Sequence, residues 1–283
     1  MDGGGPASLE APPGARTPEE EAEVRALALQ GELGAKQMLN MQRCLALAIE
    51  RGMDWLVCNL DADEALLCRG AAGDLLAAVP PDVWHLQLLN HEGVPEAAAA
   101  SADFFLGCTL FKRNPFLLVE TTEEQRRCMR FWGERVASAA SEAVDPGPSA
   151  ATAALQPSEA YFSGYCNGKC AVRVADCSAA GVRPDGAHHW AAPEEAEARA
   201  DPEELCVLHY NNCQGIAGLV RKFAARTEER LNRIEFHQLC QRLHTAGDGA
   251  LDRYLSRGLL LRVEDESEVA RQLASGVCLR LTA

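Results

Sequence analysis

Three carboxylates within four residues, Asp61, Asp63 and Glu64, are the feature of the sequence that most suggests chemistry. They follow the apolar run 55–58, whose residue types favour a buried strand. Open α/β sheets bind their ligands at the carboxyl ends of such strands. Because Asp61 and Asp63 are two residues apart, turn or extended geometry lets their side chains converge. Two interpretations fit the motif alone: a divalent-metal site and a solvated acidic turn.

Histidines late in the chain could complete a metal site. His188 and His189 follow a polar turn, and His209 lies in a strand-like run, 206–210. Carboxylate oxygens combined with an imidazole suit Mn²⁺ well and Zn²⁺ passably, whereas Mg²⁺ prefers oxygen and water. Adjacent histidines point in different directions, so we expect at most one of His188 and His189 to be a ligand. A structural role is the alternative for each of the three.

Basic residues near these motifs could contact phosphate oxygens around the metal. The candidates for this role are Lys169, Arg173 and Lys222. Lys222 lies in the charged run 221–230, which fits a solvated helix face equally well. Other kinds of site find little support in the sequence. It has no CxxC pair for a zinc site, no nucleophile elbow for a catalytic triad, and no P-loop or GxGxxG stretch for nucleotide binding.

Composition limits the class of protein. The chain has 283 residues, 47% of them apolar, which is enough for one large domain or two ordinary ones. A formal net charge of −14 makes nucleic acid an unsuitable ligand. Twelve irregularly spaced cysteines favour reduced thiols, with disulfides an alternative in a secretory compartment. The sequence shows no membrane segment and no signal peptide, which predicts that the chain as written is soluble.

Helical and strand-like segments alternate, which predicts an α/β layered domain. Residues 1–24 are rich in Gly, Pro, Ala and Glu, and we predict a disordered tail there. Hydrophobic periodicity predicts strands at 55–58, 83–89, 170–174 and 206–210, and helices at 26–51, 73–79 and 123–140, with further helices in 236–283. Thr122 is the expected N-cap of the helix at 123–140.

Four blocks in a fixed order carry a resemblance to a known family. They are the strand that ends in Asp-Ala-Asp-Glu at 61–64, the block 161–174 with Asn-Gly-Lys-Cys-Ala-Val-Arg-Val, the stretch 181–190 that ends in His-His-Trp, and Leu-His-Tyr at 208–210. Together they resemble the GT-A glycosyltransferases of the family 2 and family 92 type over residues 36–223. The resemblance implies a Rossmann-like mixed sheet flanked by helices, a nucleotide-diphospho-sugar donor, and a glycan or other hydroxyl acceptor.

The resemblance also implies roles for individual residues. Asp61 and Asp63 would bind Mn²⁺ or another divalent cation and, through it, the donor diphosphate, with His188 or His189 nearby. Family 92 members invert the anomeric carbon, which requires a carboxylate base. Glu92, which follows a predicted strand, and Glu64 are the two candidates for that base.

GT-A domains usually begin with a strand, a helix and a strand that hold the nucleotide base. Here only the tail and one helix precede the acidic motif, so we expect residues 25–223 to form a GT-A domain that is incomplete at its N-terminus. Residues 224–283 would form a peripheral helical region. Two alternatives stay open: a catalytically impaired relative that binds a glycan or a protein, and a metal-dependent phosphohydrolase. An N-terminal anchor upstream would indicate the Golgi or secretory lumen.

Overall fold

The computed structural model describes residues 17–96, 103–118, 120–143, 161–162, 165–186, 188–211, 213–214, 217–218, 220–221, 235–247, 249–261 and 265–281. The chain divides into two compact units, which are described separately. The first comprises Met1–Ala62, Leu66–Leu89 and Asn167–Val207, and the second comprises Asp63–Ala65, Asn90–Cys166 and Leu208–Ala283. The boundaries of these units differ from those of the predicted domains, 25–223 and 224–283.

The first unit is built on a four-stranded sheet with the order β1-β6-β3-β7. Its strands are β1 (Trp55–Val57), β6 (Lys169–Arg173), β3 (His85–Leu88) and β7 (Glu197–Arg199). β6 pairs antiparallel with both β1 and β3, whereas β3 pairs parallel with β7. The mixed α/β class is therefore confirmed. The sequence does not predict β7, whose exposed charged residues suit an edge strand.

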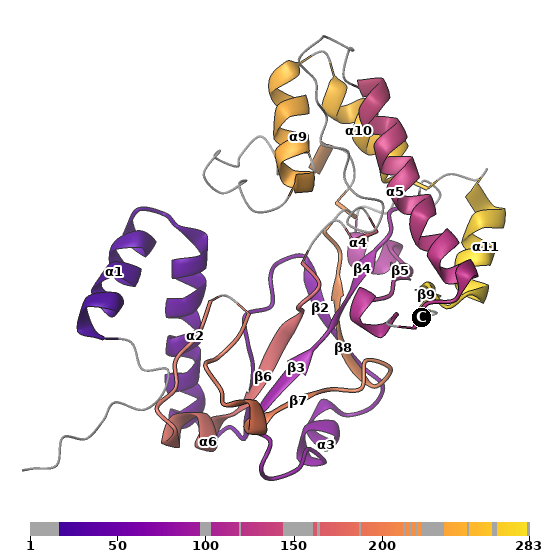
Figure 1. Ribbon diagram of the computed structural model, residues 1–283. Helices are drawn as coiled ribbons and strands as arrows, with labels where there is room; N and C mark the ends of the chain where they lie inside the picture. Colours follow the sequence, from indigo (N-terminus) through magenta and orange to yellow (C-terminus); the bar gives the residue numbers. More distant parts are fainter. Residues whose placement is uncertain are drawn as a thin grey trace, which may run out of the picture. The chain divides into compact units, whose positions relative to one another are not determined.

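Two helices, not one, precede β1. α1 (Pro18–Leu29) and α2 (Leu33–Glu50) lie side by side (Figure 1) and are joined through Gly31, whose φ of 94° is left-handed. α1 begins inside the predicted disordered tail, where Thr17 forms a capping box with Glu20. The predicted single helix at 26–51 was wrong because glycine at position 31 ends the first helix.

Apolar residues on both faces of β6 form the core of the first unit. Cys170 and Val172 pack with Met41 of α2 and with Trp190, while Ala171 faces the opposite way onto Leu86 and its neighbours. The remaining elements of this unit are α3 (Ala72–Ala77), α6 (Val174–Ala179) and the short 3₁₀ turn Glu194–Ala196. Every one of the twelve cysteines lies in the described part of the chain, and none forms a disulfide.

The second sheet has five strands in the order β2-β8-β4-β5-β9. Its strands are β2 (Glu64–Cys68), β8 (Leu205–His209), β4 (Asn90–Gly93), β5 (Leu110–Lys112) and β9 (Cys278–Arg280). β5 pairs antiparallel with β4 and with β9. β9 lies in the C-terminal region that was predicted as helical, so that region also contributes a strand.

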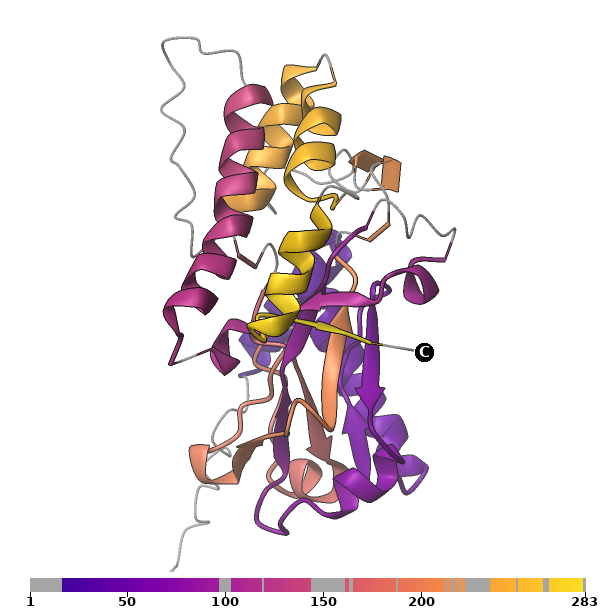
Figure 2. The ribbon, with the colours of Figure 1, turned by 90° about the vertical axis from the view of Figure 1, so that its right-hand side faces the viewer.

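Helices of the second unit pack against one another beside its strands. α5 (Glu123–Ala143) runs alongside α10 (Ala250–Gly258), as Figure 2 shows, and the remaining helices are α4 (Phe104–Gly107), the 3₁₀ turn Pro115–Leu117, α9 (Glu235–Ala246) and α11 (Glu266–Ala274). Trp132 of α5 is buried in the core with Leu110 and Val277. Among the helices of the described residues, we find none with the length and apolar character needed to cross a membrane.

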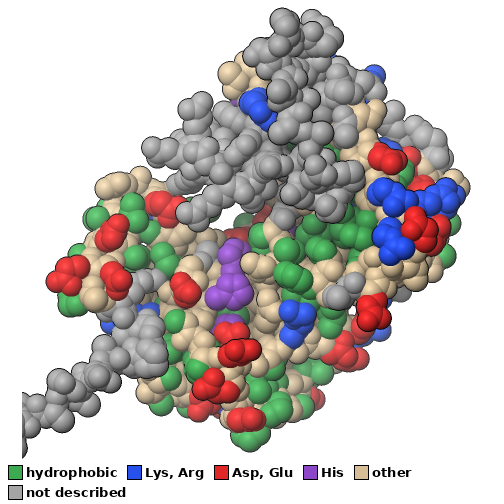
Figure 3. All heavy atoms as spheres, in the orientation of Figure 1, with side chains coloured by type: hydrophobic (Ala, Val, Ile, Leu, Met, Phe, Trp, Pro, Cys, Tyr) green, Lys and Arg blue, Asp and Glu red, His purple; other side chains and the backbone are tan. Residues whose placement is uncertain are grey.

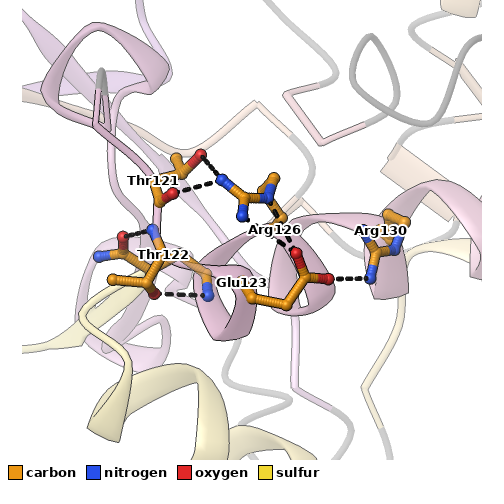
Figure 4. A network of polar contacts seen from close by, with 6 residues as sticks. Thr121, Thr122, Glu123, Arg126 and Arg130 are labelled. Atoms are coloured by element: carbon orange, nitrogen blue, oxygen red, sulfur yellow. Dashed lines mark hydrogen bonds and ion pairs between the residues drawn. The ribbon is translucent and has the colours of Figure 1, made fainter.

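Thr122 caps α5 as predicted. Its hydroxyl accepts a hydrogen bond from the Gln125 backbone N–H at 3.1 Å, and the Gln125 side chain accepts one from the Thr122 N–H at 2.9 Å (Figure 4). We expect Thr122→Ala to lower the free energy of unfolding by about 1 kcal/mol, since the N–H groups of the first turn lose a partner. Thr122→Ser keeps the acceptor and should unfold at the wild-type urea concentration. Equal midpoints for the alanine and serine variants would contradict the capping role.

Candidate functional site

Asp61 lies in the loop after β1, where the sequence predicted the acidic motif. Asn59 turns the chain there with a φ of 55°. The two oxygens of the Asp61 carboxylate accept hydrogen bonds from different elements of the first unit: Oδ2 from Lys169 Nζ of β6 at 2.9 Å, and Oδ1 from Gln37 Nε2 of α2 at 2.8 Å. The carboxylate is therefore fixed in position and paired with a cation.

Lys169 is unusual because its charged side chain is 0% exposed, whereas that of Asp61 is 35% exposed. A buried ammonium needs an anionic or hydrogen-bonding partner, and Asp61 is such a partner. The sequence predicted Lys169 as a phosphate contact. In the structure the Lys169 ammonium is buried against the Asp61 carboxylate and does not reach solvent. This favours a role in holding the carboxylate in place.

His188 lies near the same ion pair. Its Nδ1 is 3.1 Å from the Gly168 carbonyl oxygen, which fixes Nδ1 as the protonated nitrogen. Burial, followed by the positive charge of Lys169, lowers the pKa of His188 to about 4. The imidazole is thus neutral at pH 7. Asp61, Lys169 and His188 form one cluster in the first unit.

Asp63 and Glu64 belong to the second unit. The Asp63 Oδ2 accepts a hydrogen bond from Gln214 Nε2 at 3.3 Å, and the Asp63 carbonyl oxygen accepts one from the Tyr210 N–H at 2.8 Å. Glu64 is buried at the start of β2. His209 is the last residue of β8, inside the strand predicted at 206–210, and its buried ring lies 5.1 Å from the ring of Tyr165.

The remaining predicted site residues have structural contacts. Glu92 is fully buried in β4, and its Oε2 is 3.0 Å from Lys112 Nζ. Arg173 donates hydrogen bonds from Nη2 to the carbonyl oxygens of Val79, Pro80 and Val83, and its guanidinium lies 4.7 Å from the centre of the Trp55 ring. Arg173 therefore secures the loop before β3. Lys222 lies outside the described residues.

His189 is half-buried, and its ring lies 6.2 Å from that of the buried His85. Figure 3 shows histidine side chains reaching the visible surface, with acidic side chains scattered over the same view. Burial lowers the pKa of His85 to about 4, with a smaller contribution from His189. His85 therefore remains a neutral, structural histidine.

These positions can be compared with the needs of a divalent cation. Both oxygens of Asp61 already accept hydrogen bonds, one of them from an ammonium. In the described part of the chain, no three His, Cys, Asp or Glu side chains are grouped so that they could hold a metal ion. In these positions the described residues do not fit the expected Mn²⁺ site.

Two glutamines that the sequence analysis missed hold the acidic motif. Gln37 binds Asp61, and Gln214 binds Asp63. Gln37 lies four residues before Met41, which is buried, so helical periodicity places both on the inner face of α2. That periodicity is a signal that could have found Gln37. The sequence contains no comparable signal for Gln214.

Buried histidines make stability depend on pH. His91 of β4 is 1% exposed, and its Nδ1 accepts a hydrogen bond from the Asn114 N–H at 3.2 Å. Burial, followed by Arg113, lowers its pKa from 6.5 to about 4. The unfolded chain therefore binds a proton that the folded chain does not, between those two pH values. The contribution of neutral His91 to the free energy of unfolding is therefore complete above pH 6.5, and it is lost as the pH falls toward 4.

We expect His91→Gln to reduce this dependence by about 1.4 kcal/mol per pH unit, the contribution of one proton. The side-chain oxygen of the glutamine can still accept a hydrogen bond from the Asn114 N–H. Urea unfolding at several values between pH 7 and pH 4.5 measures the slope for both proteins. An unchanged slope in the variant would show that His91 is not the group that resists protonation.

The structure is a mixed α/β fold in which the acidic sequence motif at 61–64 follows β1. Over 183 residues, 63% of this chain, it is 30% identical to a protein of Arabidopsis thaliana named Glycosyltransferase-like At2g41451, covering 34% of that relative. It is 29% identical over 183 residues to a second Arabidopsis thaliana protein, named Glycosyltransferase-like At3g57200, covering 30% of it. The chain thus spans about a third of each relative. No family model matches the chain, and no solved structure matches it significantly.

Proposed function

We propose that this chain takes part in glycosyl transfer from a nucleotide-diphospho-sugar donor to an acceptor hydroxyl. The observation that carries the proposal is the similarity to two proteins named glycosyltransferase-like across 63% of the chain. The mixed α/β fold and the acidic motif directly after β1 support it. The assignment to family 2 or family 92, the manganese ion and the inverting outcome stay predictions of the resemblance.

In such a transfer, the bond between the anomeric carbon and the diphosphate oxygen breaks, and the nucleoside diphosphate leaves with the bonding electrons. The acceptor oxygen forms the new bond to the anomeric carbon and gives up its proton. Asp61 and Asp63 are partly exposed carboxylates, each held by a glutamine amide. Fixed carboxylates of this kind can accept hydrogen bonds from the hydroxyls of a sugar.

The proton of the acceptor hydroxyl requires a base. Glu92 is paired with the Lys112 ammonium and fully buried, which opposes its removal of a proton from an acceptor. Glu64 is also largely buried, at 6% exposed against 0% for Glu92, but it lies next to the partly exposed Asp63 within the acidic motif. Of the two predicted candidates, we therefore assign the base to Glu64.

A binding module without catalysis is the second candidate function. The observation in its favour is the ion pair between Asp61 and Lys169, which already occupies a carboxylate that a catalytic metal would use. Binding of a donor or glycan without release of nucleoside diphosphate would select this alternative.

Calorimetric titration with a panel of UDP-sugars and GDP-sugars tests the leading proposal. We expect the wild-type chain to bind one donor class, and Asp63→Asn to weaken that binding about tenfold, the loss of one charge-assisted hydrogen bond. Asp82→Asn is the matched control, since Asp82 is an exposed carboxylate outside the motif. Absence of binding to every donor, or equal losses in both variants, would contradict the proposed function.

A further inference from the structure

We infer that the ammonium of Lys169 takes the place of a divalent cation at Asp61. The first carboxylate of the acidic motif is then neutralised by a cation that belongs to the fold. The 2.9 Å contact between Lys169 Nζ and Asp61 Oδ2 is the starting observation. Gln37 occupies the other oxygen at 2.8 Å, so the carboxylate is held from two elements at once.

The backbone fixes the position of the ammonium. Lys169 is the first residue of β6, the strand that pairs with β1 on one side and β3 on the other. In the register of this sheet, Lys169 lies opposite Leu88. The preceding Gly168 is left-handed, with a φ of 67°, and is packed against the Leu88 carbonyl. Both contacts are with Leu88, so the backbone that carries the lysine is fixed against β3.

Burial keeps the ammonium at the carboxylate. The Lys169 side chain is 0% exposed, so its charged group has no contact with solvent. Moving Asp61 onto a metal ion would leave a buried ammonium without this carboxylate, which is strongly unfavourable. A divalent cation placed beside the ammonium would also be repelled by it. Both effects weaken metal binding at Asp61, by about a hundredfold or more together.

The role of Asp61 changes accordingly. It joins α2, through Gln37, to β6, through Lys169, and this holds the start of the acidic loop in place. Lys169 and Gln37 are positioning residues in this arrangement, because they act through Asp61. Asp61 belongs to the site of the proposed function, but the inference can be tested without a donor, so either one can fail alone.

Titration with Mn²⁺ alone, followed by the electron paramagnetic resonance signal of the unbound ion, tests the inference. Four proteins are compared: the wild type, Asp61→Asn, Lys169→Met and the double variant Asp61→Asn/Lys169→Met. We expect the Asp61→Asn variant to bind Mn²⁺ with the same affinity as the wild type. We expect Lys169→Met to increase Mn²⁺ affinity at least about tenfold by releasing the carboxylate, and the double variant to lose that gain.

Each outcome decides the question. One Mn²⁺ bound tightly by the wild type and lost in Asp61→Asn would overturn the inference, and so would Lys169→Met without any gain in affinity. Mn²⁺ binding that Asp61→Asn does not alter lies elsewhere and agrees with the inference. The comparison of wild type with Asp61→Asn is decisive even if Lys169→Met fails to fold. Near-ultraviolet circular dichroism checks the folding of each variant.

Discussion

Lys112→Met is expected to lower the free energy of unfolding by about 3–5 kcal/mol, because it leaves the Glu92 charge buried without its ion-pair partner. Glu92 is 0% exposed and Lys112 4% exposed, and the two lie directly opposite each other on β4 and β5. The ammonium also donates a hydrogen bond to the Tyr161 carbonyl oxygen at 2.7 Å and lies 5.1 Å from the centre of the Trp132 ring. Chemical unfolding in urea measures the loss.

The double variant Lys112→Met/Glu92→Leu separates the lost pair from a general effect of substitution. It removes both charges, so we expect it to recover much of the stability that the single variant loses. Arg126→Ala is the exposed control. Arg126 pairs with Glu123 at the surface of α5 (Figure 4), and we expect no measurable change in stability there. Equal losses for Lys112→Met and the double variant would contradict a buried charge as the cause.

Gly168→Ala is expected to cost about 3 kcal/mol or more. A Cβ atom at this position would lie 1.9 Å from the Leu88 carbonyl oxygen and 2.9 Å from the Leu89 Cα, and backbone atoms cannot move aside as a flexible side chain can. The φ of 67° adds strain for any residue with a side chain. Because Gly168 directly precedes Lys169 and its carbonyl oxygen contacts His188, the variant should also displace the cluster around Asp61.

Gly52→Ala is the matched control for this substitution. Gly52 is also left-handed, with a φ of 62°, but nothing lies within 4 Å of the added Cβ. It should therefore show only the conformational cost of a left-handed alanine, about 1 kcal/mol. Thermal and urea unfolding of both variants supply the comparison. A Gly168→Ala variant no less stable than Gly52→Ala would disprove the close packing of this turn on Leu88.

Some strands could be predicted from the sequence because their apolar residues are continuous. β1, β6 and β8 are of this kind, and each was predicted within a residue or two of its observed ends. β4 was missed because it consists of the polar residues Asn90, His91 and Glu92 and a glycine, yet all four are buried. Their partners, Lys112 and Asn114, lie more than 18 residues further on, so no local pattern reveals the buried polar network.

The candidate site shows the same division between local and distant information. Asp61 and Lys169 were both singled out by residue type, and the position of Asp61 after β1 was predicted. Their pairing was not predicted, because 108 residues separate them and only the antiparallel pairing of β1 with β6 brings the two strands together. Lys169 was interpreted as a phosphate contact for lack of this partner. The fully buried position of Glu92 likewise depends on β5, which is distant in sequence.

Glycosyl transfer by this chain is tested most directly by the release of nucleoside diphosphate from a panel of nucleotide-diphospho-sugars, measured with purified wild-type chain and with Asp63→Asn. Reactions are run with and without Mn²⁺ and with a mixture of glycan acceptors. We expect release from one donor class, dependent on acceptor and reduced at least about tenfold by Asp63→Asn. No release from any donor under either metal condition, with wild-type protein shown to be folded, would contradict glycosyl transfer by this chain.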